Sequence, residues 1–236
     1  MKKYNWVAML PFYLLAAIVC IGAAVWGSGA VTTAVQNAPV EREYTVIIDP
    51  GHGGIDGGAT SCTGVLESGI NLEIGLRLND LLGLLGHDTV MIRTTDTSVY
   101  TEGNTIAAQK VSDLKERARI CNETENAVLI SIHQNTFSDS RYGGAQVFYA
   151  PTKGSQSLAT ALQNGFCAEL NPGSSRRCKA AESVYLLQNI RCTGVLLECG
   201  FLSNPEEEAK LRSAEYQQKI CCVIAAALNE FFDSGG

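Results

Sequence analysis

Residues 44–60 read YTVIIDPGHGGIDGGAT, and this stretch decides the fold. Val46–Ile48 is a short β-branched run, typical of a strand buried in a sheet, and it stops at Asp49–Gly51, residue types that break a strand. His52 follows at the turn, before two glycine pairs that let the backbone pass close to a ligand. Ligands of open α/β sheets collect beyond the carboxyl ends of the strands, so His52 is a candidate site residue. Taken alone, a loop histidine that caps its own turn is an equally good explanation.

Two later apolar runs end in the same way. Ala127–Ile132 leads to His133, and Val195–Leu197 leads to Glu198. A lone charge that continues a buried apolar run costs several kcal/mol, so Glu198 must be paired, protonated or part of a site. Glu198 is therefore the strongest acid–base candidate of the chain.

Glu67 lies just ahead of a predicted helix or in its first turn. Leucines at helical spacing predict that helix, which ends near Gly86, and a strand is expected over Asp88–Arg93. On its own, a carboxylate at this position is explained by the helix dipole that it complements. His87, beyond the helix end, is expected to be a surface turn histidine and not a ligand.

Four ionisable residues thus gather at strand ends and one helix start: His52, Glu67, His133 and Glu198. Two histidines with one carboxylate are a common three-ligand zinc set that leaves a position open for water, and a second carboxylate can then act as base. The spacing is too wide for a local metal motif such as HExxH. Each residue has an ordinary explanation by itself, but the four together predict a zinc site.

The rest of the chain continues the alternation of strands and helices that is typical of an α/β fold. Helices are expected over Asp113–Asn122, over Ser155–Leu170 with a serine cap, and from Pro205 with apolar spacing through Phe231. A short strand is expected over Gln146–Tyr149. The polar loop after Leu170 contains two arginines that can hold an anionic substrate group, although an exposed basic loop is the more ordinary explanation.

The N-terminus predicts a membrane anchor. Lys2–Lys3 precedes Val7–Trp26, a run without charge that is long enough to cross a bilayer core of about 30 Å. The lysines are expected to stay in the cytoplasm, which places the rest of the chain outside. Small residues after the run also permit its removal as a signal peptide, which would give a secreted protein. We therefore divide the chain into an anchor or signal segment (1–27), a linker (28–43) and one domain (44–233).

The net charge and the cysteine content indicate which kinds of partner and which redox setting to expect. The net charge of −6 argues against a nucleic-acid partner, because surfaces that bind nucleic acid are basic. The nine cysteines include no CxxC pair, so a cysteine zinc site is not expected. Cys121, Cys199 and Cys221 lie in apolar contexts. We expect mostly free, buried cysteines, which suggests a weakly oxidising or anaerobic setting.

Four segments resemble, in order and spacing, the zinc-dependent N-acetylmuramoyl-L-alanine amidases of bacterial cell walls. They are DPGHGG (Asp49–Gly54), E-x-x-x-N (Glu67–Asn71), S-x-H-x-N (Ser131–Asn135) and LLECGFLSN (Leu196–Asn204). The likeness runs from Tyr44 to Phe232 and is specific as a set. It implies a mainly parallel sheet of about six strands flanked by helices, in one catalytic domain.

The resemblance also assigns roles to the four residues. In that family the matching histidine, glutamate and histidine bind zinc, which implies that His52, Glu67 and His133 hold one zinc ion. The glutamate of the last segment is the catalytic base, which implies that Glu198 takes the proton of the attacking water. The bond that breaks joins the lactyl carbonyl of muramic acid to L-alanine in peptidoglycan.

Two details suggest a subtype. Family members restrained by a regulatory helix carry extra residues after the second histidine, whereas Phe137–Tyr149 is a short connection, so the site is expected to stay open. With a membrane anchor and no wall-binding repeats, the chain most resembles the spore-cortex, germination-associated amidases. Cys62 and Cys199 depart from the family's pattern and put in doubt how the site withstands oxidation or soft metals.

Two rival functions remain open at this stage. A zinc carboxypeptidase or endopeptidase that acts on the stem peptide needs the same metal and base. A non-catalytic wall-binding protein is the other, although the presence of Glu198 disfavours it. The preferred glycan, an activating accessory protein and the oligomeric state are not predicted.

Overall fold

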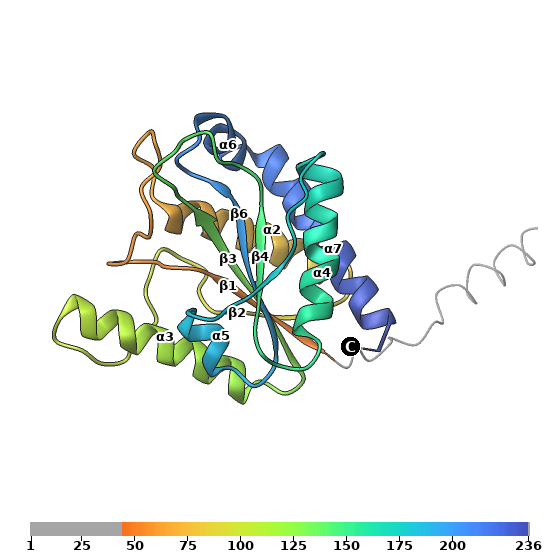
Figure 1. Cartoon of the computed structure of the whole chain (residues 1–236). Coiled ribbons are helices and arrows are strands. Elements are labelled where there is room, and N and C mark those ends of the chain that lie inside the picture. Colours follow the sequence, from red (N-terminus) through yellow and green to blue (C-terminus); the bar gives the residue numbers. More distant parts are fainter. Residues whose placement is uncertain (1–43, 236) are drawn as a thin grey trace, which may run out of the picture. The chain divides into compact units, whose positions relative to one another are not determined.

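The computed structural model describes residues 44–235, which form a six-stranded sheet in the order β2-β1-β3-β6-β4-β5 (Figure 1). The strands are β1 (Thr45–Pro50), β2 (Asp88–Met91), β3 (Ala127–Asn135), β4 (Gln146–Tyr149), β5 (Lys179–Ala180) and β6 (Thr193–Phe201). Strands β2, β1, β3 and β6 are mutually parallel, and β4 runs antiparallel to β6. The predicted mainly parallel sheet of about six strands is confirmed.

Helices cover both faces of this sheet. They are α2 (Glu67–Leu84), α3 (Ile106–Glu123), α4 (Ser155–Gly165) continued by the π-helical turn η1 (Phe166–Leu170), α5 (Tyr185–Asn189), α6 (Pro205–Leu211) and α7 (Ala214–Asp233). Figure 1 shows α2, α4 and α7 on one face and α3 with α5 on the other. The sheet is therefore the middle layer of three, as the alternation of strands and helices predicts.

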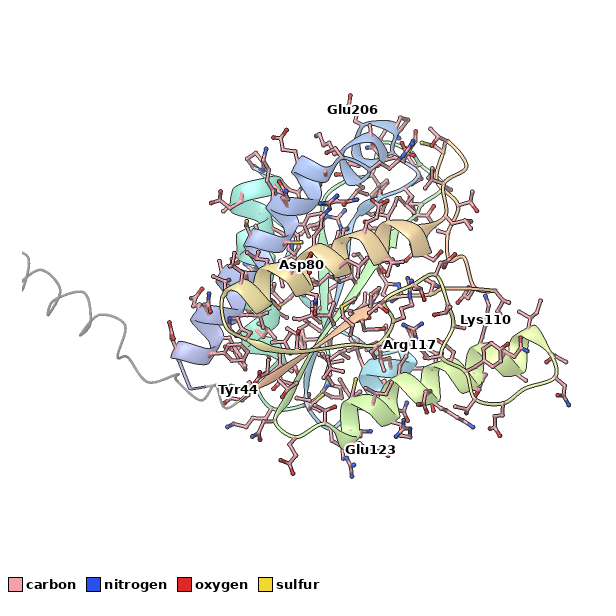
Figure 2. All side chains as sticks on the ribbon, turned by 180° about the vertical axis from the view of Figure 1, so that it is seen from behind. Tyr44, Asp80, Lys110, Arg117, Glu123 and Glu206 are labelled. Atoms are coloured by element: carbon pink, nitrogen blue, oxygen red, sulfur yellow. The ribbon has the colours of Figure 1, made fainter. Side chains whose placement is uncertain are left out.

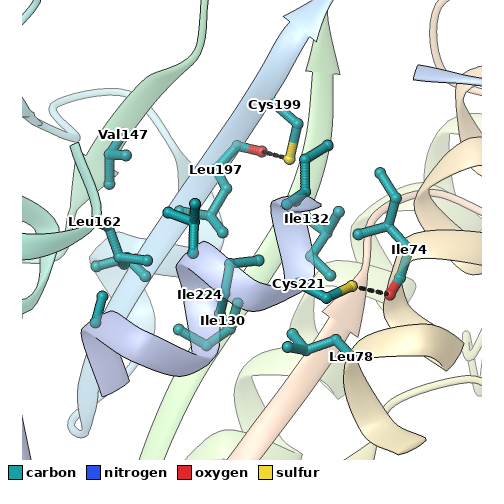
Figure 3. Packing of buried hydrophobic residues seen from close by; sticks show 14 of the residues in the cluster. Ile74, Leu78, Ile130, Ile132, Val147, Leu162, Leu197, Cys199, Cys221 and Ile224 are labelled. Atoms are coloured by element: carbon teal, nitrogen blue, oxygen red, sulfur yellow. Dashed lines mark hydrogen bonds between the residues drawn. The ribbon is translucent and has the colours of Figure 1, made fainter. Parts of the chain in front are cut away.

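Alternating side chains of the strands belong to two apolar layers, one on each face of the sheet. Ile130, Ile132 and Leu197 point to the larger layer, where they pack against α2, α4 and α7 (Figure 3). Leu129 and Leu196 point to the smaller layer, under α3 and α5. Neighbouring residues of a strand face opposite sides of the sheet. The residues that follow these apolar side chains along each strand therefore also alternate between the two faces.

Two predicted helix boundaries are wrong. The helix expected from Pro205 to Phe231 is two helices, because α6 ends at Leu211 and the Ser213 side chain caps α7 by accepting the Tyr216 N–H. The expected serine cap of α4 is also wrong: Ser155 is already helical, and its Oγ accepts the Gly194 N–H at 2.9 Å. The Ser213 cap is a local signal that the continuing apolar spacing obscured, whereas the partner of Ser155 lies in β6, far along the chain.

His87 is not the surface histidine that the sequence predicts. It is 5% exposed, and its Nε2 lies 3.0 Å from Oδ1 of Asn229 on α7. Its ring packs at 5.5 Å from the ring of Phe232, which in turn stacks on Tyr44. The C-terminal end of α7 thus covers the turn between α2 and β2, a long-range contact that local pattern cannot predict.

The predicted anchor (1–27) and linker (28–43) lie outside the described residues. Between residues 44 and 235, no helix combines the length and the apolar character that a bilayer crossing requires.

A buried ion pair joins β1 to α3 at the carboxyl edge of the sheet. Arg117 is almost fully buried, forms an ion pair with Asp49, and contacts Asp113 at 2.6 Å (Figure 2). It also donates to the carbonyl of His52 at 2.7 Å, while Asp49 accepts from Ser131 Oγ at 2.6 Å. Burial acts to raise the pKa of Asp49, but Arg117, Ser131 and His133 together outweigh burial and hold that pKa below its usual value.

Replacing Arg117 with glutamine should strongly destabilise the fold, because Asp49 would be left as an uncompensated buried charge. The expected loss is about 3–5 kcal/mol in the free energy of urea unfolding, followed by circular dichroism. Arg119→Gln is the matched control: the same helix carries it, but its partners Glu116 and Glu123 lie at the surface, so the midpoint should hardly move. Equal effects of the two substitutions would show that the buried pair has no special weight.

Candidate active site

Three side chains from distant parts of the chain meet at the carboxyl edge of the sheet. His52 follows β1, Glu67 opens α2, and His133 lies in β3. His52 Nε2 is 3.3 Å from Oε2 of Glu67, and His133 Nδ1 is 3.0 Å from Oε1 of the same carboxylate. One donor atom from each residue lies within 4.8 Å of the others.

The backbone conformation around His52 allows the three side chains to approach one another. His52 has a positive φ of 61°, a conformation that non-glycine residues rarely adopt. Gly51 precedes it, and a Cβ there would lie 2.2 Å from the His133 ring. Gly58 is equally constrained, since a Cβ on it would lie 2.6 Å from Oε2 of Glu67. Only glycine at these two positions allows the donors to approach, which explains the glycine-rich stretch after β1.

A second carboxylate orients His52. Asp56 Oδ2 lies 2.8 Å from His52 Nδ1, and Lys110 on α3 lies 2.7 Å from the other oxygen of Asp56. Burial alone would lower the pKa of His52, but hydrogen bonds and attraction to Glu67, and then to Asp56, raise it to about 9. Asp56 thus engages Nδ1 and leaves Nε2 directed at Glu67, as carboxylates behind ligating histidines commonly do. No pattern in the sequence pointed to Lys110.

Glu67 is fixed by donors on both sides. It is 3% exposed, and its two oxygens accept the backbone N–H groups of Ala59 (2.9 Å) and Gln134 (3.1 Å). The amide of Asn71, one helical turn on, donates to Oε1 at 3.2 Å. Burial opposes ionisation, but His133 and His52 hold the pKa of Glu67 well below its usual value. Asn71 belongs to the E-x-x-x-N segment, so the sequence contained a signal for it.

Glu198 stands beside His133 through strand register. The two residues are paired across β3 and β6, so both side chains point to the α3 face of the sheet. Both lie inside their strands, which run on to Asn135 and Phe201, and not beyond the strand ends as the sequence suggested. Burial raises the pKa of Glu198 to about 7, against the lowering effect of His133. Within the described chain, Oε2 of Glu198 is buried and has no hydrogen-bond partner.

A cleft of about 260 Å³ lies between α3 and α5, and its lining includes both histidines of the donor set. Besides His52 and His133, Lys110 of α3, Tyr185 of α5 and Leu196 of β6 line the cleft. The connection between β3 and β4, residues 136–145, contains no helix. A substrate carbonyl can therefore reach His52 and His133 from this cleft.

The other residues that the sequence singled out lie outside the donor set. Arg176 donates to the Gly143 carbonyl at 3.0 Å and lies 5.5 Å from the Phe201 ring centre, so it braces a loop. Cys199, although next to Glu198 in sequence, faces the larger apolar layer (Figure 3). Cys62 is exposed on the loop before α2. The position of Cys199 removes it from the donor set.

The donor set fits a zinc ion. Two imidazoles and one carboxylate lie close enough to share one ion, and backbone and side-chain partners orient both His52 and Glu67. Zinc sites with three protein ligands commonly have this composition and this kind of outer support.

Fold and site together define the class of the protein: an α/β protein in which two histidines and two carboxylates lie together at the carboxyl edge of an open sheet, where ligands bind. The family model described as N-acetylmuramoyl-L-alanine amidase matches residues 46–230, and the chain belongs to this family.

Similar proteins support this family membership. The chain is 34% identical to the germination-specific N-acetylmuramoyl-L-alanine amidase of Bacillus subtilis, over 81% of each chain. Among solved structures, the CwlD amidase from Clostridioides difficile, in complex with the GerS lipoprotein, matches with a TM-score of 0.77 and 34% identity, over 80% of this chain and 98% of the other. An N-acetylmuramoyl-L-alanine amidase from Clostridium difficile 630 matches with a TM-score of 0.72 and 31% identity, over 83% of this chain and all of the other.

The chain is therefore an N-acetylmuramoyl-L-alanine amidase, an enzyme that hydrolyses the amide bond between N-acetylmuramic acid and L-alanine in peptidoglycan. This confirms the function that the sequence motifs predicted.

Proposed function

We propose that this amidase is a zinc enzyme in which His52, Glu67 and His133 are the ligands and Glu198 is the general base. The observation that supports this most is the convergence of the three donors within 4.8 Å, beside a buried carboxylate of raised pKa. When bound there, zinc would supply a Lewis acid that makes water more acidic and polarises the scissile carbonyl.

The residues of the chain perform the proton transfers. With a pKa of about 7, Glu198 is partly ionised at neutral pH and is a much stronger base than an exposed glutamate. It accepts the proton of the attacking water, and the protonated carboxyl then gives this proton to the nitrogen of the departing alanine. Asp56 keeps His52 oriented, and Asn71 keeps Glu67 oriented, so the donors need little rearrangement during the reaction.

We further propose that the natural substrate is the peptidoglycan of the spore cortex and that an accessory protein assists the enzyme. The first proposal is supported by the B. subtilis relative, whose name is germination-specific. The second is supported by the CwlD structure, which contains the GerS lipoprotein. The short connection 136–145 supports a site that the chain itself does not cover.

We predict that the purified protein binds one zinc ion per chain and that His133→Ala loses it, because two remaining ligands cannot fix the metal geometry. Metal content after dialysis measures this. His87→Gln is the matched control: His87 is the third histidine of the chain, is also buried, and lies under α7 away from the donor set, so zinc should be retained. Full zinc content in the His133→Ala protein would remove His133 from the ligand set.

Glu198→Gln should keep zinc and fold but lose hydrolysis by about 10²–10⁴-fold, because an amide preserves the shape and cannot accept a proton. Zinc content and the rate of peptidoglycan cleavage are measured on one preparation, with the fragments identified by mass spectrometry. Glu230→Gln, an exposed position on α7, should leave both unchanged.

Three results of this experiment would contradict the assignment. Loss of zinc together with activity would make Glu198 a ligand, and a near-normal rate would place the base elsewhere. Fragments cut within the stem peptide, with the lactyl amide intact, would make the enzyme a peptidase.

We also propose that residues 1–27 anchor the chain in the bacterial cell membrane and that the domain (44–233) faces away from the cytoplasm. The support is Lys2–Lys3 ahead of the uncharged run Val7–Trp26. Protease added to intact protoplasts should remove the domain, whereas a cytoplasmic marker protein stays intact. A shortened, soluble form in the medium would instead show that the segment is a cleaved signal.

A further inference from the structure

Two cysteines meet on the α3 side of the sheet, at the end remote from the catalytic edge. Cys121 lies in the last turn of α3, and Cys192 lies just before β6. Both side chains belong to the smaller apolar layer, each shifts the pKa of the other, and neither is in a disulfide. Cys121 is 1% exposed, whereas Cys192 is only partly buried and packs against the smaller apolar layer.

The backbone on both sides of the pair is held in place. Asn122, next to Cys121, accepts the backbone N–H of Arg191 at 2.7 Å and donates to the carbonyl of Asn189 at 2.9 Å. Arg191 immediately precedes Cys192, so one side chain ties the two cysteine-bearing segments together. Figure 1 shows α3, which carries Cys121, beside α5, which ends three residues before Cys192. The fold therefore holds the two cysteine-bearing segments beside each other.

The two thiols are chemically unequal. Cys121 is buried whereas Cys192 is only partly buried, and in keeping with this the pKa of Cys121 is raised by Cys192 and by burial while the pKa of Cys192 is lowered by Cys121. The thiolate is the reactive form of cysteine, and attack also requires access. The partly exposed Cys192 is thus the better first nucleophile, and the buried Cys121 is placed to attack second.

We propose that Cys121 and Cys192 form a thiol–disulfide exchange site whose oxidant is an organic disulfide. The Cys192 thiolate attacks one sulfur of this disulfide, forms a mixed disulfide and releases one thiolate. Cys121 then loses its proton and attacks the Cys192 sulfur, which releases the second thiolate. The two protein thiols are oxidised to one disulfide, and the organic disulfide is reduced to two thiols.

The oxidised form has a mechanical consequence. The new bond closes the chain from 121 to 192 and joins α3, which carries Arg117, to the start of β6, which carries Glu198. A cross-link over such a long loop restricts the unfolded chain and stabilises the native state. The site does not depend on the bound metal, so its test is independent of the proposed zinc chemistry.

Oxidised glutathione is the probe, added to the full-length protein. After incubation, free thiols are alkylated under denaturing conditions, and the digest is analysed by mass spectrometry without reductant. We expect a peptide pair linked through Cys121 and Cys192, which dithiothreitol separates. The melting temperature should rise by at least about 5 °C on oxidation and return on reduction.

Variants test the two roles. In Cys121→Ala the reaction should stop at a stable glutathione adduct on Cys192, and in Cys192→Ser no linked pair and no melting shift should appear. Cys62→Ser and Cys222→Ser are matched controls at exposed cysteines and should still form the pair. Glutathione confined to Cys62 and Cys222, with both proposed residues free, would overturn the proposal. A linkage of Cys192 to any cysteine other than Cys121 would overturn it as well.

Discussion

The carboxyl edge of the sheet depends on the burial of one guanidinium group. Arg117 neutralises Asp49 at the end of β1 and also binds the carbonyl of His52. Taking both charges out of water is costly, and an apolar pair of similar volume would often be more stable. What the ion pair provides is position: it fixes α3 over the sheet and fixes the backbone from which His52 projects. Asp49 extends this control to β3 through Ser131.

Strand register is the second constraint. His133 and Glu198 are neighbours because β3 and β6 are parallel and paired at these residues. A slip of one residue would turn Glu198 into the larger apolar layer and bring Cys199 to the catalytic face. The apolar residues that alternate with Glu198 along β6 oppose this slip, since the same error would take Leu197 out of the larger apolar layer. The core therefore aligns the chemistry as well as stabilising the fold.

The sequence predicted the elements that carry strong local signals and missed those set by distant contacts. Val46–Ile48 and the two later apolar runs indicated buried strands, and the polar residue after each run indicated the functional edge. Arg117 gave no such signal, because a charged residue on an amphipathic helix is normally at the surface. His87 was misplaced for a related reason, since only the packing of α7 buries it. Burial of a polar group depends on a partner that local pattern does not contain.

The glycines around the donors divide the molecule into parts with different freedom to evolve. At Gly51 and Gly58 even one added carbon would collide with His133 or Glu67, so these positions admit no side chain whatever the substrate. The cleft walls formed by α5 carry side chains that hold none of the donors, among them the exposed Tyr185. Mutations that adapt the enzyme to a different wall polymer must therefore accumulate on these walls, while the reaction centre stays unchanged.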